Sequence, residues 1–240
     1  TAVTRTAVRM LDNVLDVTYW PLPEQRREAQ AKRRIGLGFL GLGSALVMLG
    51  IRYDSAQGVA FGAQVAQALR DEAYRASVDL AGEKGAFPAL DVDRYLQSGF
   101  TRRLPQDIRS AVAERGIRNS HLLSIAPTGT ISLAFADNAS NGIEPPFSWF
   151  YRRKKRMPDD SMRTYLVEDH AYRLYRHLHA PGGESPALPD TFVTALEMAA
   201  LDHMRMSAAV QPFIDTAISK TVNVPEDYPF EEFEGLYLEA

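Results

Sequence analysis

Apolar residues recur at helical spacing at the start of the chain, between residues 3 and 18. The positions that share one face of the expected helix are Val3, Ala7, Met10, Leu11, Val14 and Leu15. We expect this helix to end before Pro21 and Pro23, because proline cannot continue a helix. A polar, helix-forming stretch comes next, and the apolar, glycine-rich stretch from Ile35 to Ile51 then predicts a buried helix.

Capping residues and periodicity predict further helices along the rest of the chain. Their expected first or capping residues are Asp54 or Ser55, Pro105, Thr191 and Asp227. The long helix after Ser55 is expected to close at Gly85, and the shorter one after Pro105 at Gly116, which is well placed as a C′ residue. The helix after Thr191 would bury a face that includes Phe192 and Leu196.

Short apolar stretches between these helices predict strands. Residues 122–126 fit a buried strand, and residues 147–157, aromatic and then basic, fit a strand or hairpin arm with its turn at 158–161. Residues 219–224 also fit a strand, whereas residues 180–190 form a linker-like loop. Helices separated by short buried strands predict an α/β fold with parallel strands.

The composition is that of a globular protein without cysteine. The 240 residues are 45% hydrophobic and 24% charged, with a net charge of −3, which argues against a broad basic face for nucleic acid. Without cysteine there is no disulfide, thiolate metal site or thiol nucleophile within these residues, and a cytoplasmic location is expected. The chain shows neither a signal-peptide pattern nor an initiator Met, so we expect it to begin inside a longer protein.

Gly36, Gly38 and Gly41 match the G-x-G-x-x-G pattern of dinucleotide-binding proteins. That mechanism needs a strand before the first glycine and a helix after the last. The residues before Gly36 are strongly polar and predict no buried strand. We therefore favour close helix packing for these glycines, with a dinucleotide-binding oxidoreductase as an alternative function.

Two other polar clusters have plain structural interpretations. Residues 152–156 are five consecutive cations, a pattern that can bind nucleic acid but that more often forms a solvated edge strand. A non-enzymatic helical interaction module with this basic arm is a further alternative function. No two of the five histidines have the spacing of a zinc-binding helix, so we expect surface or packing roles for them and no metal site.

The strongest candidate site is the loop that follows the predicted strand at 122–126. It consists of Pro127, Thr128, Gly129, Thr130 and Ile131. Successive backbone N–H groups in such a loop can hold an anion, and a following helix adds its positive end. Gly129 lets the backbone approach an oxyanion, and Thr128, Thr130 and Ser132 offer hydroxyl groups. The alternative is a simple strand-to-helix turn.

At this loop the sequence resembles a known family. IRNSHLLSIAPTGTIS followed by NASNGIEPPF is similar to the class II, adenosylcobalamin-dependent ribonucleoside-diphosphate reductases. The resemblance extends over essentially the whole chain through VRMLDNVLDVTYWPLPEQ, RRIGLGFLGLGSAL, EKGAFP and AAVQPFIDTAISKTVNVPEDYPFEEFEGLYLEA.

The resemblance implies a ten-stranded α/β barrel of two five-stranded halves, of which residues 1–240 would be one incomplete domain in the second half. It implies that Pro127 to Ile131 bind the phosphates of a ribonucleoside diphosphate. In the family a cysteine thiyl radical, generated with adenosylcobalamin, starts the reduction that supplies deoxyribonucleotides for DNA replication, and a thioredoxin-type protein supplies electrons.

Those cysteines are expected upstream and downstream of this chain. This chain alone would therefore be inactive and would hold no catalytic residue or metal ligand. We further expect a homodimer, and neither a membrane nor a nucleic-acid partner.

Overall fold

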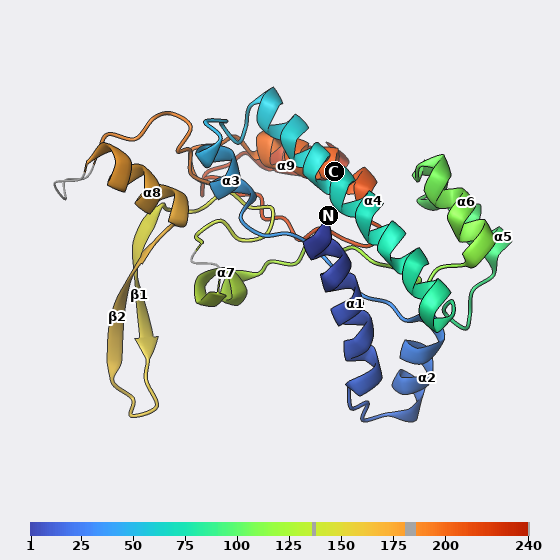
Figure 1. Cartoon of the computed structure of the whole chain (residues 1–240). Helices are drawn as coiled ribbons and strands as arrows, with labels where there is room; N and C mark the ends of the chain where they lie inside the picture. The colour runs from blue at the N-terminus through green and yellow to red at the C-terminus, as the bar shows by residue number, and fades with distance from the viewer. Residues whose placement is uncertain (136–137, 181–185, 240) are drawn as a thin grey trace. The chain divides into compact units, whose positions relative to one another are not determined.

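The computed structural model describes residues 1–135, 138–180 and 186–239 (Figure 1). Within this part of the chain the elements are α1 (Ala2–Val17), α2 (Pro23–Lys32), α3 (Leu42–Met48), α4 (Ala56–Lys84), α5 (Val92–Leu96), η1 (Thr101–Arg103), α6 (Gln106–Arg115), α7 (Gly129–Phe135), β1 (Phe150–Arg156), β2 (Met162–Glu168), α8 (His170–His179), α9 (Ala200–Val210), η2 (Gln211–Phe213) and α10 (Phe230–Glu239). None of the described helices is both long and apolar enough to cross a membrane.

The chain forms two compact units, and α4 contributes residues to both. Unit 1 comprises Thr1–Gly38, Ala63–Ile125 and Val210–Ile218, and unit 2 comprises Phe39–Gly62, Ala126–Ala209 and Ser219–Ala240. Each unit consists of three segments that are far apart in sequence. Contacts within one unit therefore join residues that the other unit separates along the chain.

Parallel backbone pairing in unit 1 is confined to a few residues. Leu37 forms a parallel bridge with Leu123, and Ile125 forms one with Ile218. The N–H of Leu37 donates to the carbonyl of Leu122 at 2.7 Å, so the predicted strand at 122–126 is present as two short bridges. Its apolar side chains at Leu122, Leu123 and Ile125 are buried, as predicted.

Asp215 binds the backbone at the start of this paired segment. Its two carboxylate oxygens accept hydrogen bonds from the N–H groups of Leu122 and Leu123, both at 2.8 Å. The phenol of Tyr74, a buried side chain of α4, donates to the same carboxylate at 2.7 Å. Backbone groups that lack a full sheet partner are therefore paired with a carboxylate.

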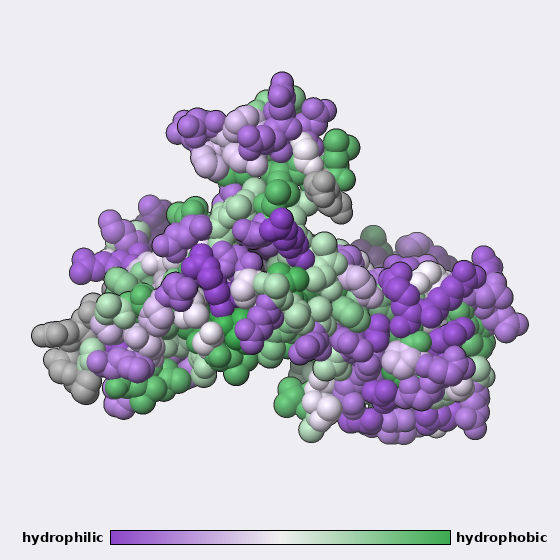
Figure 2. Space-filling model, turned by 90° about the horizontal axis from the view of Figure 1, so that it is seen from above, coloured by the Kyte–Doolittle hydropathy of each residue, from purple (hydrophilic) through white to green (hydrophobic). Residues whose placement is uncertain are grey.

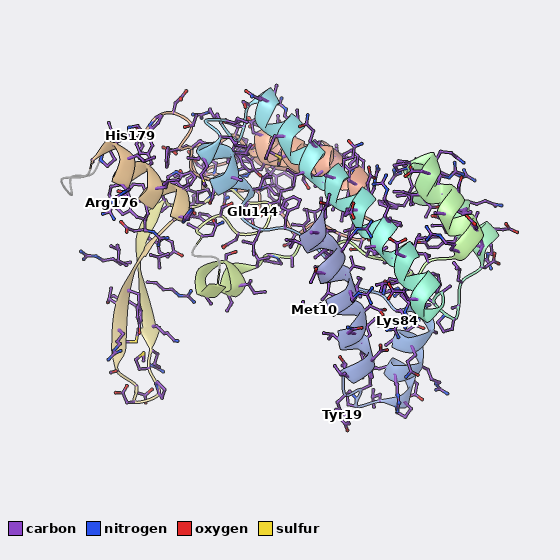
Figure 3. The ribbon with its side chains drawn as sticks, in the orientation of Figure 1. Met10, Tyr19, Lys84, Glu144, Arg176 and His179 are labelled. Carbon is purple, nitrogen blue, oxygen red and sulfur yellow. The ribbon has the colours of Figure 1, made fainter. Side chains whose placement is uncertain are left out.

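A buried ion network joins α1 to the rest of unit 1. Asp12 is fully buried, and its carboxylate accepts from Arg33 at 2.8 Å, from Asn119 at 3.0 Å and from Arg118 at 3.2 Å. Lys84, at the end of α4, adds a longer contact of 3.5 Å (Figure 3). Burial raises the pKa of Asp12, but the hydrogen bond with Arg33 and the charge of Arg118 outweigh it and hold the pKa below its usual value.

This network decides which face of α1 is buried. The buried residues of α1 are Val8 and Asp12, whereas Val3 is 82% exposed and Met10 is 57% exposed. The predicted helix is confirmed, but Val3, Met10 and Val14 of its apolar face are exposed. Figure 2 shows hydrophobic residues among hydrophilic ones on the surface of the molecule.

Unit 2 contains the regular sheet of the described residues, an antiparallel hairpin of β1 and β2 that leads into α8 (Figure 1). This confirms the predicted hairpin and its turn at 158–161. Arg153 lies opposite Tyr165, and Lys155 lies opposite Arg163, so two like charges face each other across the ribbon. At the base of the hairpin, Trp149 packs edge-on against Phe192 and donates from Nε1 to the carbonyl of Phe192 at 2.8 Å.

Two predicted elements are wrong. The helix expected after Thr191 begins only at Ala200, because the preceding residues bond elsewhere: the N–H of Ala195 donates to the carbonyl of Pro146 at 2.9 Å. Phe192 is buried by packing against Trp149 and not by helical periodicity. Residues 219–224 form no strand, since their pairing stops at the bridge of Ile218.

The glycine-rich stretch also differs from its prediction. Only Leu42–Met48 is helical, and Gly38 lies in the extended segment beside the strand-like residue Ser124. A Cβ at Gly38 would lie 2.2 Å from the carbonyl oxygen of Ser124. Gly36 and Gly38 thus allow close approach of two extended segments, which corrects the expected helix packing.

We expect Asp12→Ala to destabilise unit 1 by about 3–5 kcal/mol, because it leaves buried cations without a counter-charge. The measurement is chemical unfolding of the intact protein. Asp79→Ala is the matched control, since Asp79 also pairs with two arginines but is 41% exposed. It should cost less than about 1 kcal/mol. Equal losses for both variants would contradict a special role for the buried network.

Candidate functional site

The loop Pro127 to Ile131 bends at Thr128 and then enters α7. Thr128 has a positive φ of 56°, an uncommon conformation for a residue with a side chain. Its carbonyl accepts from the N–H of Ser132 at 2.8 Å, and its Oγ1 lies 2.9 Å from Oγ of Ser132. Gly129, Thr130 and Ile131 then form the first turn of α7, where backbone N–H groups have no partner within a helix.

Gly129 has no evident structural reason to be glycine. Its φ is not in the left-handed region, and the residue of the loop with a positive φ is Thr128. Among the described residues, a Cβ at Gly129 would meet only the Nδ2 of Asn141, at 4.0 Å. The space in front of this backbone is open to a group from outside the described chain.

A second segment, Asn138–Glu144, lies against the loop. The N–H of Gly142 donates to Oγ1 of Thr128 at 2.7 Å, which joins the two segments directly. The hydroxyl of Thr128, which the sequence offered to a ligand, thus accepts a hydrogen bond within the fold and also contacts Ser132. Thr130 and Ile131 remain exposed.

Other contacts hold the Asn138–Glu144 segment along most of its length. Asp169 is fully buried and accepts from the N–H of Ala139 and from Oγ of Ser44, both at 2.7 Å. The N–H of Gly43 donates to Oγ of Ser140 at 2.9 Å. The phenol of Tyr53 donates to the carbonyl of Ile143 at 2.6 Å, and burial raises the pKa of that phenol well above its usual value.

Asn141 is the exception within this segment. Its Oδ1 is buried without a hydrogen-bond partner among the described residues, and its Nδ2 is the atom nearest to the open side of Gly129. Buried amide oxygens normally find a partner. Sequence reasoning did not single out Asn141, because it lies in the quoted NASNGIEPPF stretch without any periodicity or spacing that marks a site.

The far end of the segment is fixed by a buried ion cluster of Glu144, Lys220 and His203. Glu144, labelled in Figure 3, forms an ion pair with Lys220, and its other carboxylate oxygen accepts from the N–H of Thr221. Lys220 Nζ also lies 2.8 Å from Nδ1 of His203 and 2.8 Å from the carbonyl of Thr221. The three protons of an ammonium group therefore have three acceptors.

This geometry fixes the protonation of His203. Nε2 lies 3.0 Å from the carbonyl of Ala195 and must donate, so Nδ1 is the acceptor that faces Lys220. A neutral ring with its proton on Nε2 satisfies both contacts. Burial and the nearby charge of Lys220 lower the pKa of His203 from its ordinary value of 6.5.

The remaining sequence candidates do not form comparable sites. The spaces in front of Gly38 and Gly41 are filled by Ser124 and Asn138, each within 2.2 Å of where a Cβ would be, so a pyrophosphate has no room there. The cations at 152–156 lie exposed on β1, as the structural interpretation predicted. No cluster of potential metal ligands occurs among the residues that the structure describes.

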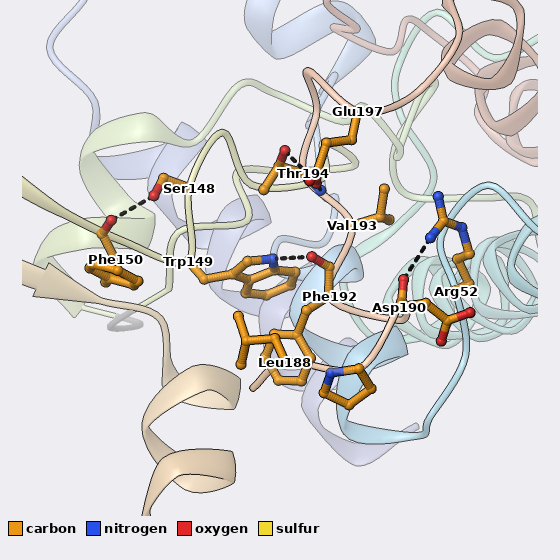
Figure 4. A pocket seen from close by; sticks show the side chains of 11 residues that line it. Arg52, Ser148, Trp149, Phe150, Leu188, Asp190, Phe192, Val193, Thr194 and Glu197 are labelled. Carbon is orange, nitrogen blue, oxygen red and sulfur yellow. Dashed lines mark hydrogen bonds between the residues drawn. The ribbon is translucent and has the colours of Figure 1, made fainter. Parts of the chain in front are cut away.

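Unit 2 also has a cavity of about 450 Å³ between β1 and the segment 188–197 (Figure 4). Arg52 lies on its wall, but its guanidinium already binds Asp54 at 2.7 Å and the carbonyl of Asp190 at 2.7 Å. Glu197 accepts from the N–H of Thr194 at 2.7 Å. Arg52 and Glu197 are thus already hydrogen-bonded within the protein.

Comparisons with known proteins identify relatives of the whole chain. Residues 1–240 match the family model described as ribonucleotide reductase, barrel domain. A vitamin B12-dependent ribonucleoside-diphosphate reductase of Mycobacterium tuberculosis is 36% identical over 98% of this chain and 33% of its own length. One of Thermoplasma acidophilum is 29% identical over 97% of this chain and 30% of its own length. The chain thus spans about a third of the length of these relatives.

Acid should weaken unit 2 through His203. The native ring resists protonation, whereas the unfolded ring takes up a proton near pH 6.5, so stability should fall as the pH drops below 6.5 towards the lower native pKa. One proton contributes at most about 1.4 kcal/mol per pH unit. Unfolding of the intact protein between pH 7 and 5 should show a smaller change of stability with pH for His203→Gln than for the wild type.

Some dependence of stability on pH should remain in the variant, because burial also lowers the pKa of His121. An unchanged slope would show that His203 titrates normally.

Proposed function

Because this chain belongs to the ribonucleotide reductase barrel domain family, we propose that it is part of an enzyme that reduces ribonucleoside diphosphates to 2′-deoxyribonucleoside diphosphates. Two of its relatives are named as vitamin B12-dependent reductases of that substrate class, which supports adenosylcobalamin as the cofactor of the complete enzyme. The same proposal includes a ten-stranded barrel, thiyl-radical chemistry, a thioredoxin-type reductant, a homodimer and a cytoplasmic location. All of these are expected from membership of the family.

This segment would supply substrate binding and not the radical. It contains no cysteine, so the thiyl group would come from another part of the complete enzyme. The described residues also offer no assignable cobalamin contact. His203 is committed to Ala195 and Lys220, and Arg52 and Glu197 in the cavity are already hydrogen-bonded within the protein. We assign no step of the reaction to the cofactor through this chain.

The proposed role of the loop Pro127 to Ile131 is to hold the phosphates of the substrate. The observation that carries it is the open space in front of Gly129 at the first turn of α7. Backbone N–H groups there point outward from the start of the helix and can donate to phosphate oxygens. The loop has no lysine, so the donors and the helix dipole would supply the attraction.

This arrangement recognises phosphate without recognising the base. The donors are main-chain groups, and Thr128, the residue that shapes the loop, is held by Gly142. The geometry is therefore in place before a substrate arrives, and binding needs little further ordering of the loop. Affinity for the phosphates should accordingly be similar for all four ribonucleoside diphosphates.

We expect Gly129→Val to weaken substrate binding in the complete enzyme much more than Thr130→Ala. The valine side chain would occupy the space proposed for the phosphate, whereas Thr130→Ala removes one hydroxyl and keeps the backbone donors. Losing one hydrogen bond to a charged group costs about 1.5–3 kcal/mol, or roughly ten- to a hundredfold in affinity. Equilibrium binding of each ribonucleoside diphosphate is the measurement.

Gly82→Val serves as the control for the same substitution in a helix. Gly82 lies in α4, and nothing approaches the position of its Cβ within 4 Å. It should leave substrate affinity unchanged. If Gly129→Val folds normally and binds all four diphosphates as tightly as the wild type, the loop is only a turn between elements.

A further inference from the structure

The cluster of Glu144, Lys220 and His203 has no part in the proposed phosphate contacts. Its ion pair nevertheless lies largely buried in unit 2, beside the neutral ring of His203. The side chains of Lys220 and Glu144 are 6% and 15% exposed, and His203 is fully buried. Burial lowers the pKa of Lys220, and the charge of Glu144 offsets that effect only in part. Such a cluster is costly to desolvate and needs a reason beyond stability.

The contacts of Glu144 lead to the candidate loop in two short steps. The N–H of Glu144 donates to the carbonyl of Asn141 at 2.8 Å, which closes a turn around Gly142. The N–H of Gly142 then donates to Oγ1 of Thr128 at 2.7 Å. The position of Thr128, which has the positive φ, is thus tied through one turn to the carboxylate that Lys220 holds.

Lys220 fixes that carboxylate with little freedom. Its ammonium group has three acceptors in the Glu144 carboxylate, Nδ1 of His203 and the carbonyl of Thr221. The N–H of Thr221 holds the second oxygen of Glu144, so the carboxylate is clamped on both sides. A hydrophobic pair of similar volume would fill the space but would not fix the Asn141–Glu144 turn through hydrogen bonds.

We propose that Lys220 is a positioning residue for the phosphate loop and acts through Glu144, with His203 as the neutral group that orients the ammonium. The proposal rests on the proposed function of the loop. It adds that the affinity for the diphosphate depends on a buried ion pair that never touches the substrate.

The test is Lys220→Met in the complete enzyme, with equilibrium binding of a ribonucleoside diphosphate and of the matching ribonucleoside, and with thermal unfolding. We expect about a tenfold or greater loss of diphosphate affinity, the size of one good hydrogen bond, and no change in nucleoside affinity. The double variant Lys220→Met/Glu144→Gln avoids an unpaired buried charge. The double variant should recover most of the stability while its diphosphate affinity stays low. If the single variant does not fold, the binding measurement is made on the double variant instead.

Lys84→Met is the matched control, because Lys84 contacts a different buried carboxylate, that of Asp12 in unit 1. It should lower the unfolding temperature without changing either affinity. If Lys220→Met and the double variant bind the diphosphate as the wild type does while Gly129→Val does not, the positioning role is wrong and the phosphate loop stands. If Gly129→Val also binds normally, both proposals fail.

Discussion

Buried backbone N–H groups need acceptors, and in this chain much of the buried backbone lies outside helices and strands. Carboxylates supply such acceptors at two places, Asp215 for Leu122 and Leu123 and Asp169 for Ala139, and Glu144 does the same for the more exposed N–H of Thr221. Each carboxylate satisfies an irregular segment that no sheet ladder reaches. The irregular segments around the candidate site therefore have defined positions because acidic side chains replace the missing strand partners.

The same constraint explains how a loop without a cation can be prepared for an anion. The positive charge of Lys220 is kept inside the cluster, where Glu144 neutralises it, and the loop presents main-chain donors and the hydroxyl of Thr130 but no cation. A flexible surface lysine would attract phosphate too, but it would have to be ordered on binding at an entropic cost. A loop held by Gly142 would avoid that cost, and in the proposed phosphate site its fixed geometry would give the selectivity.

Local signals predicted local structure well. Ser55 caps α4 through the N–H of Gly58 at 3.0 Å, and Gly116 ends α6 with a φ of 74°, because capping depends on residues within one turn. The helix expected after Thr191 failed because Ala195 and Phe192 bond to Pro146 and Trp149, far away in sequence. The loop at 127–131 was proposed as a site from its residues and stays a prediction, but the cluster behind it joins positions 76 residues apart, which no periodicity reveals.

The like charges on the hairpin bear on how copies of this protein meet. Lys155 and Arg163 face each other on one side of the ribbon, and no carboxylate pairs with either of them in the part of the chain that the structure describes. Two such ribbons repel each other before their open edges can pair, which keeps an exposed edge from templating aggregation. Concentrated salt shortens the range of that repulsion to about 3 Å at 1 M. We therefore expect these like charges to protect the exposed edges of the hairpin at low ionic strength and to protect them less in concentrated salt.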